Sequence, residues 1–231
     1  MHMQPVNRSK AQAQATYDRL SRWYDVLAGS SEKRLIDAGL LRLAVHDGDK
    51  VLEIGCGTGH AILVLARAAG DSGRVYGLDI SAGMLRVAQQ GVNRAGLSGR
   101  VDLHQGDAAQ LPFDDASLDA IFSSFTLELF DTPDIPVVLG ECRRVLRDGG
   151  RLCIVAMSRA GKRGLMLRLY EWAHDRFPRY VDCRPIYAQA AVQAAGFRLV
   201  DGIVKSTWGL PVEIVVAEAR TDSYCALTIT P

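Results

Sequence analysis

The middle of the chain carries short apolar runs at regular intervals, each bounded by glycines or by charged residues. Runs of this length are typical of strands that are buried on both faces of a sheet. The pattern predicts strands at 50–54, 74–78, 101–104, 118–123 and 151–157. Asp148-Gly149-Gly150 predicts a turn that leads into the last of these.

The segments between these strands have apolar positions at helical spacing, and they predict helices at about 60–69, 81–95 and 132–147. Ser81 is a suitable N-cap for the second helix. Thr132-Pro133 predicts an N-cap followed by proline at the first helical position of the third. Strands that alternate with helices favour right-handed crossovers and a mostly parallel sheet covered on both faces.

The alternation stops after Met157. Residues 158–182 predict an inserted helical cap, and a further helix is expected at about 185–195. Two β-rich segments, 198–207 and 212–219, are joined by Trp208-Gly209-Leu210-Pro211 and predict a hairpin, so the last strand should run antiparallel to the others. We therefore expect a doubly wound α/β fold with a mostly parallel seven-stranded sheet.

The segment before the first strand predicts a separate helical unit. We expect residues 1–49 to form an N-terminal helical lid, residues 50–231 to form the core, and the cap to be inserted at about 158–182. A length of 231 residues suits one large domain with such additions.

Composition and charge narrow the classes of function. The net charge of +1 gives no overall field that would attract nucleic acid or an anionic membrane, so nucleic acid is not an expected partner and membrane contact would need a local patch of charge. No apolar run approaches the roughly 18 residues of a membrane span, and the first residues lack the apolar core of a signal peptide, which favours the cytoplasm. Scattered cysteines without a C-x-x-C pair argue against disulfides and against a metal site: Cys56, Cys142, Cys153, Cys183 and Cys225.

The strongest local signal is a glycine-rich loop between the first strand and the first helix of the core, Gly55-Cys56-Gly57-Thr58-Gly59. Glycines let a backbone turn sharply and approach a ligand closely, and the amides at a helix start favour a carboxylate or a phosphate. By itself such a loop is also compatible with a tight turn that only packs strand against helix.

Two carboxylates sharpen this interpretation. The spacing G-x-G-x-G differs from the dinucleotide pattern G-x-G-x-x-G, because His60 and Ala61 follow Gly59. Asp79 ends the second strand, where a carboxylate can bind the hydroxyls of a ribose. Glu53 would repel a pyrophosphate at the same place. A zwitterionic ligand with a ribose therefore fits better than a dinucleotide.

The motifs along residues 45–157 together resemble the class I S-adenosylmethionine-dependent methyltransferases, in particular the branch with ubiquinone/menaquinone-biosynthesis and phospholipid N-methyltransferases. The resemblance rests on the glycine loop and on four further stretches: Asp79-Ile80-Ser81-Ala82-Gly83-Met84-Leu85, Gly106-Asp107-Ala108 with Leu111-Pro112-Phe113, Leu118-Asp119-Ala120-Ile121 with Ser123-Ser124-Phe125, and Val145-Leu146-Arg147-Asp148-Gly149-Gly150.

The resemblance implies S-adenosylmethionine as cofactor and S-adenosylhomocysteine as product. Asp79 would accept the ribose hydroxyls, Asp107 the adenine amino group, and Ile80 and Met84 would enclose the ring. The cofactor site implied in full consists of Tyr17, Glu53, Gly55, Cys56, Gly57, Gly59, Asp79, Ile80, Met84, Gly106, Asp107, Ala108, Ser123 and Ser124. For the two aspartates loop capping is the alternative, and for Met84 core packing is compatible with ring contact.

The acceptor side is less defined. Tyr17 and Tyr24 stand in a segment that resembles the helix that closes over the cofactor in this family, and their hydroxyls could reach the methionine carboxylate or the acceptor. They could equally form an aromatic stripe packed on the sheet. Glu128 stands where many relatives carry a histidine; it could orient or deprotonate an acceptor, or be an exposed loop charge. His60 and His174 are weaker candidates for a base.

The cap sequence from Lys162 to Arg179 mixes apolar residues with arginines. It could line an acceptor pocket, contact a membrane surface as a basic amphipathic helix, or be an ordinary surface helix. The oligomeric state is left as monomer or homodimer.

Methyl transfer from a sulfonium is an in-line displacement that needs alignment and exclusion of water, and a base only where the acceptor arrives protonated. We expect a methyltransferase for a small-molecule or lipid-like acceptor such as a quinone precursor, a phospholipid amine or a natural product. The alternative is a protein of the same fold that uses the cofactor structurally or for other chemistry. A nucleic-acid methyltransferase and a nicotinamide dehydrogenase fit the sequence less well.

Overall fold

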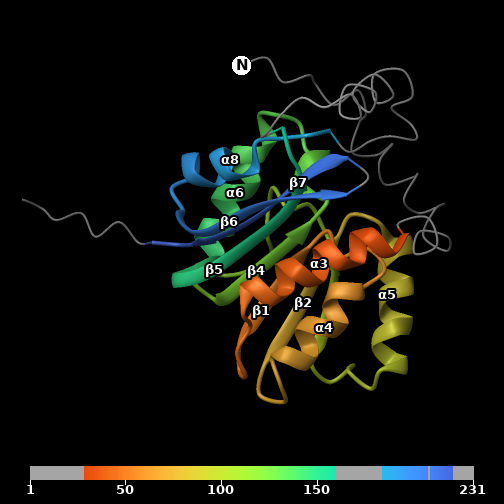
Figure 1. Cartoon of the computed structure of the whole chain (residues 1–231). Coiled ribbons are helices and arrows are strands. Elements are labelled where there is room, and N and C mark those ends of the chain that lie inside the picture. Colours follow the sequence, from red (N-terminus) through yellow and green to blue (C-terminus); the bar gives the residue numbers. More distant parts are fainter. Residues whose placement is uncertain (1–28, 160–183, 208, 221–231) are drawn as a thin grey trace, which may run out of the picture.

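The computed structural model describes residues 29–159, 184–207 and 209–220. Its helices and strands alternate along the chain as the sequence predicts (Figure 1). The strands are β1 (Lys50–Ile54), β2 (Arg74–Asp79), β3 (Val101–Gln105), β4 (Leu118–Ser124), β5 (Leu146–Met157), β6 (Arg198–Thr207) and β7 (Leu210–Glu218). The helices are α3 (Gly29–Leu43), α4 (His60–Ala68), α5 (Ala82–Arg94), the short 3-10 helix η1 (Leu127–Leu129), α6 (Asp134–Val145) and α8 (Ala188–Ala194).

The strands form one seven-stranded sheet with the order β3-β2-β1-β4-β5-β7-β6. Strands β1 to β5 pair in parallel, whereas β7 is antiparallel to both of its neighbours. The expected fold class, with its antiparallel last strand and its hairpin, is confirmed. The chain extends the sheet from β1 toward β3 and then crosses to β4 on the other side of β1. In open α/β sheets, ligands bind in the crevice that such a reversal creates at the carboxyl ends of the strands.

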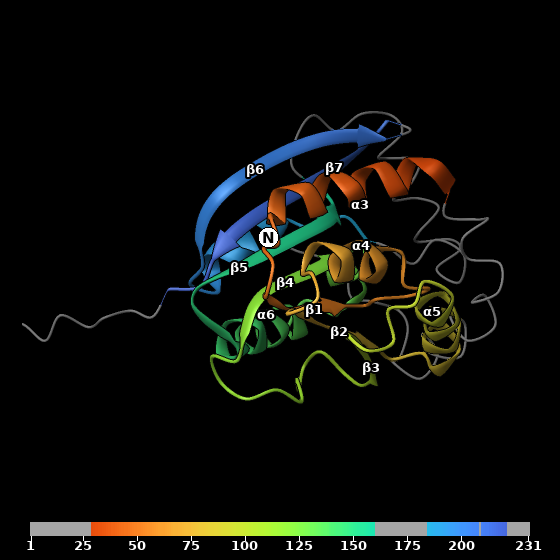
Figure 2. The same cartoon turned by 90° about the horizontal axis from the view of Figure 1, so that it is seen from below.

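Helices cover both faces of the sheet, with α3, α4 and α5 on one face and α6 and α8 on the other (Figures 1 and 2). Successive residues of the central strands therefore point into opposite halves of the core. Val51 packs with the α3–α4 side and Leu52 with the α6–α8 side, and both are fully buried. This explains why these strands are apolar at nearly every position.

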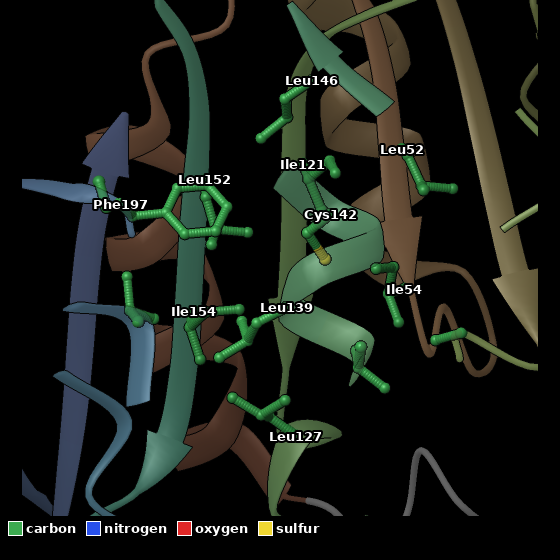
Figure 3. Packing of buried hydrophobic residues seen from close by; sticks show 14 of the residues in the cluster. Leu52, Ile54, Ile121, Leu127, Leu139, Cys142, Leu146, Leu152, Ile154 and Phe197 are labelled. Atoms are coloured by element: carbon green, nitrogen blue, oxygen red, sulfur yellow. The ribbon is translucent and has the colours of Figure 1, made fainter. Parts of the chain in front are cut away.

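Side chains of α6 fill the core over the central strands. Figure 3 shows Leu139 and Cys142 directed at Ile121 of β4 and at Leu152 and Ile154 of β5. All of these side chains are almost completely buried. The strands β1 and β4 are held in place by this close packing. The loops that follow them therefore begin at well-defined positions.

Several boundaries differ from the prediction. β5 begins at Leu146, because Gly149 and Gly150 exchange backbone hydrogen bonds with Ala219 and lie in a bulged stretch of the strand instead of a free turn. Pro133 is the N-cap of α6, so the helix begins one residue later than expected. The helix expected at 185–195 is shorter, since α8 begins only after Tyr187.

Much of the lid and the cap predicted from the sequence falls outside the described residues, which leaves the division into lid, core and cap a prediction. Residues 1–28 include Tyr17 and Tyr24, and residues 160–183 hold most of the cap with His174. Within the part of the chain that the structure describes, no helix is both long enough and apolar enough to cross a membrane.

Candidate functional site: the crevice at the carboxyl ends of β1 to β4

The loop after β1 needs its three glycines for different reasons. All have positive φ, at 71° for Gly55, 51° for Gly57 and 89° for Gly59. A Cβ on Gly55 would lie 2.1 Å from Oγ1 of Thr126, and one on Gly59 would lie 3.0 Å from Cβ of Ala88. A Cβ on Gly57 would meet no atom of the described residues within 4 Å. Gly57 is therefore the glycine of this loop at which a ligand can approach the backbone.

Asp79 fastens this loop to the end of β2. Its Oδ2 accepts a hydrogen bond from the amide of Gly57 at 2.9 Å, and its Oδ1 accepts one from the amide of Ser81 at 2.8 Å. Ser81 is the N-cap of α5, and its hydroxyl oxygen accepts from the amide of Met84 at 3.1 Å. A carboxylate has room for further donors beside these amides. One side chain thus holds two loops together at the edge of the crevice.

The loop after β3 adds the third side of the crevice. The amide of Gly106 donates to the carbonyl of Asp79 at 3.1 Å, which places this loop beside the end of β2. Oδ1 of Asp107 accepts from the amide of Ala109 at 3.0 Å. Ala108 and, from α5, Met84 are buried. The loop capping weighed for Asp79 and Asp107 is therefore real.

Glu53 brings a second carboxylate under the glycine loop. Its side chain is buried, and its Oε2 has no hydrogen-bond partner among the described residues. Burial raises the pKa of Glu53 well above its usual value, the charge of Asp79 raises it further, and a hydrogen bond from the amide of Ile62 opposes this. Two acidic groups this close disfavour an anion and favour a cation. The unsatisfied oxygen of Glu53 fits the ammonium group at the zwitterionic methionine end of S-adenosylmethionine, and the open face of Gly57 leaves room for that end to approach.

The end of β4 lies on the other side of β1 from Asp79, because β1 lies between β2 and β4 in the sheet. Ser123 is buried and Ser124 half-buried at the end of the strand. Phe125 follows with a φ of 49°, and its amide donates to the carbonyl of Val155 at 2.7 Å. A non-glycine residue in this region is uncommon. The left-handed residue turns the chain sharply, so that Thr126 lies against Gly55.

Glu128 is completely buried, so its interpretation as an exposed loop charge is wrong. It lies in η1 after the β4 exit, and its Oε1 accepts a hydrogen bond from the amide of Met157 at 3.0 Å. Met157 ends β5. The carboxylate therefore joins the exits of two adjacent strands on the side of the crevice away from Asp79.

The comparisons with known proteins agree with this geometry. The methyltransferase domain family matches residues 51–150, which include the carboxyl ends of β1, β2, β3 and β4. The demethylmenaquinone methyltransferase of Bacillus subtilis (strain 168) is 37% identical over 142 residues, or 62% of this chain and 58% of that protein. Residues 51–150 thus form a methyltransferase domain.

Two further proteins are similar to this chain. The 2-phytyl-1,4-naphtoquinone methyltransferase of Synechococcus elongatus is 38% identical over 116 residues, or 50% of this chain and 49% of that protein. The chain thus spans less than two thirds of the length of either relative. The crystal structure of the cyclase SpnF, 21% identical, matches with a TM-score of 0.73 over 93% of this chain and 98% of that one, which shows a shared fold.

The structure brings together most of the residues expected for the cofactor, but few of those expected for catalysis. Tyr17, Tyr24 and His174 lie outside the described residues. His60, the second candidate base, has its Nε2 3.1 Å from Oδ1 of Asp37 on α3, which makes it a link between helices. Within the described residues, no group of histidine, cysteine and acidic side chains could hold a metal ion.

Two buried polar residues, Arg184 and Ser158, lie near the β4 and β5 exits. Arg184 is 5% exposed and donates to Oγ1 of Thr132 at 2.9 Å and to the carbonyl of Phe130. Burial lowers the pKa of its guanidinium. Ser158, fully buried, pairs with Ile186 in an isolated bridge. A serine after a strand carries no sequence signal for burial, so Ser158 could not have been found by pattern alone.

Proposed function

We propose that this chain binds S-adenosylmethionine in the crevice at the ends of β1 to β4 and transfers its methyl group to a quinone-type acceptor. The observation that carries the cofactor assignment is the carboxylate of Asp79, hydrogen-bonded to Gly57 at the open face of the loop. The printed names of the relatives, demethylmenaquinone and phytyl-naphtoquinone methyltransferases, support the class of acceptor.

The proposed cofactor contacts follow the resemblance to the family. Asp79, which also accepts from the amides of Gly57 and Ser81, would accept the ribose hydroxyls. Asp107 would accept the adenine amino group, and the amide of Ala108 would donate to the ring. The loop glycines and Glu53 would surround the methionine end, where a buried carboxylate balances a cation. Bound there, the cofactor supplies an electrophilic methyl group on a sulfonium.

The remaining task of the protein is alignment. The packed strand ends fix the cofactor side, and the exits of β4 and β5 face the acceptor side, where Glu128 is buried. We propose that Glu128 orients the acceptor and, for an acceptor that arrives protonated, accepts the proton. The roles of Tyr17 and Tyr24, a cytoplasmic location, contact of the cap with a membrane, and the oligomeric state stay predictions.

Calorimetry with S-adenosylhomocysteine tests the cofactor assignment. The wild type should bind it saturably, and Asp79→Ala should abolish binding because both the ribose acceptor and the anchor of Gly57 are lost. Asp102→Ala is the control, since Asp102 lies near the start of β3 in an exposed ion pair with Arg74. Absence of binding to the wild type would end the proposal.

Product release distinguishes methyl transfer from other uses of the cofactor. The fold alone permits other chemistry, as the likeness to a cyclase illustrates. The quinone methyltransferases are the more similar proteins, at 37% and 38% identity, and they favour methylation. Incubation with demethylmenaquinone analogues should release S-adenosylhomocysteine in proportion to methylated quinone. Tight cofactor binding without product, across quinones, amines and phospholipids, would favour the alternative.

A further inference from the structure

The segment that carries Asp107 contains no helix or strand of its own. It leaves β3 after Gln105 and reaches β4 at Leu118. Within it, the carbonyl of Asp107 accepts from the amide of Gln110 at 3.0 Å, and its Oδ1 accepts from the amide of Ala109. These bonds make a compact turn that ends directly before Leu111. The position of Asp107 therefore depends on what holds Leu111.

Arg144, on the last turn of α6, binds this segment through its guanidinium group. Its Nη2 donates to the carbonyl of Leu111 at 3.0 Å and its Nη1 to the carbonyl of Phe113 at 2.8 Å. The same Nη1 lies 2.7 Å from Oδ1 of Asp115. One planar guanidinium thus reaches three residues of the segment, a geometry that an ammonium group cannot reproduce.

Glu141, one helical turn earlier, completes the arrangement. Its Oε1 accepts from Nε of Arg144 at 2.7 Å and its Oε2 from Nη2 at 2.8 Å, while Oε2 also accepts from the amide of Leu111 at 2.8 Å. The peptide groups on both sides of Leu111 are therefore bound, the amide by Glu141 and the carbonyl by Arg144. Paired charges and hydrogen bonds lower the pKa of Glu141 and raise that of Arg144.

The end of α6 fixes the far side of the same segment. The carbonyl of Arg144 accepts from the amide of Ala116 at 2.9 Å, and that of Val145 accepts from Ser117 at 2.9 Å. The side chains of Ala108 and Leu111 are buried in the core. Helix α6 contributes no residue to the expected cofactor site, yet it binds the segment that does.

We infer that the Glu141–Arg144 pair positions the loop of Asp107 for the adenine ring, and so sets the selectivity of the site for adenine. The inference rests on the proposed function, because it assumes that Asp107 accepts the adenine amino group. Glu141 and Arg144 are positioning residues, since they act through the peptide groups of Leu111. A pair that only stabilised the fold would affect all nucleoside ligands alike.

The test compares two ligands, S-adenosylhomocysteine and its inosine analogue, in which a carbonyl oxygen replaces the adenine amino group. Calorimetry gives the dissociation constant of each for the wild type, Arg144→Lys, Glu141→Gln and Arg147→Lys. The last variant is the control, because Arg147 stands three positions further on in an exposed ion pair with Asp119. Thermal unfolding shows that each variant is folded at the temperature used.

The wild type should prefer the adenine ligand, and Arg144→Lys should weaken its binding about tenfold, the effect of one lost charge-assisted hydrogen bond, with little change for the analogue. Glu141→Gln keeps an acceptor for Leu111 and should show a smaller loss of the same kind. Equal weakening of both ligands, or unchanged selectivity in a folded variant, overturns the inference alone. A wild type that binds neither ligand overturns the proposed function with it.

Discussion

At the scale of single residues, a substitution at Gly57 tests two effects: the loss of stability from a strained backbone and the loss of ligand affinity from a blocked approach. Gly57→Ala should destabilise the fold by only about 1 kcal/mol, because a positive φ is strained but no atom is displaced. The new Cβ would stand where the ligand approaches the loop, so we expect cofactor affinity to fall more than about tenfold. Denaturant unfolding and calorimetry measure the two effects.

Gly96 provides the matched control for this substitution. It follows α5 with a φ of 70°, and a Cβ there also meets nothing within 4 Å. Gly96→Ala should lose a similar stability and keep full cofactor affinity. If both variants bind equally well, the open face of Gly57 is not the ligand's approach.

Glu53 links the stability of the protein to pH. The folded-state pKa of this carboxyl is raised, so its contribution is fully present below the usual glutamic acid range and is lost as pH rises through the folded value. Glu53→Gln removes the buried charge and should make the ligand-free protein more stable at pH 8 than the wild type, with little difference at pH 4. Urea unfolding at both pH values measures this.

The same substitution should weaken the cofactor, because a neutral amide no longer balances a cation. Stability and affinity would therefore change in opposite directions. A Glu53→Gln variant that loses stability at pH 8 would show that the ionised carboxylate is satisfied in the fold.

Glu128 is the residue to test on the acceptor side. Glu128→Gln keeps an oxygen for the amide of Met157 but removes the charge. If the carboxylate orients or deprotonates the acceptor, kcat should fall by at least about tenfold while the dissociation constant of S-adenosylhomocysteine stays unchanged. A variant with wild-type kcat would assign Glu128 to structure alone.

At the scale of elements, two helical glycines should respond to alanine with opposite signs. Gly140 of α6 faces open space, and Gly140→Ala should stabilise the protein by about 0.5–1 kcal/mol through lower chain entropy in the unfolded state. A Cβ on Gly39 of α3 would lie 2.6 Å from Cγ2 of Val155 and 3.1 Å from Cε2 of Phe122. Gly39→Ala should therefore cost about 1–3 kcal/mol. Thermal unfolding that shows equal effects would mean α3 tolerates displacement from β5.

Element boundaries could be predicted where the local sequence alone sets them. β1, β6 and the Ser81 cap of α5 lie where their patterns indicate, because apolar periodicity and capping act over a few residues. The start of β5 could not be predicted. Gly149 and Gly150 read as a turn, and only pairing with Ala219, far away in the chain, extends the strand through them.

The candidate site divides in the same way. The glycine loop and Asp79 are contiguous motifs with a chemical reason for each residue, so their meeting could be anticipated from a parallel sheet. The burial of Glu128 and the hold of Arg144 on Leu111 depend on contacts between separate segments. The sequence alone does not indicate whether a charged side chain will be exposed to solvent or buried in contact with another segment.

At the scale of the whole molecule, the sheet order predicts a gradient of stability. β1, β4 and β5 have strands on both sides and helices on both faces, whereas β3 and β6 are edges of the sheet. Native-state hydrogen exchange should be slowest in the amides of the central strands and fastest in β6, where Val200 and Val204 are half exposed. Slow exchange along β6 in dilute protein would show that this edge is covered in solution.

The double attachment of Asp79 limits how this pocket can be altered. A carboxylate that would recognise the sugar also ties the first loop to the second, through Gly57 and Ser81. Replacing Asp79 to admit a phosphorylated or differently substituted sugar would also remove the hydrogen bond that holds the Gly57 loop in place for the rest of the ligand. Engineering a new nucleoside preference here would first require another anchor for that turn, so specificity and loop architecture would have to change together.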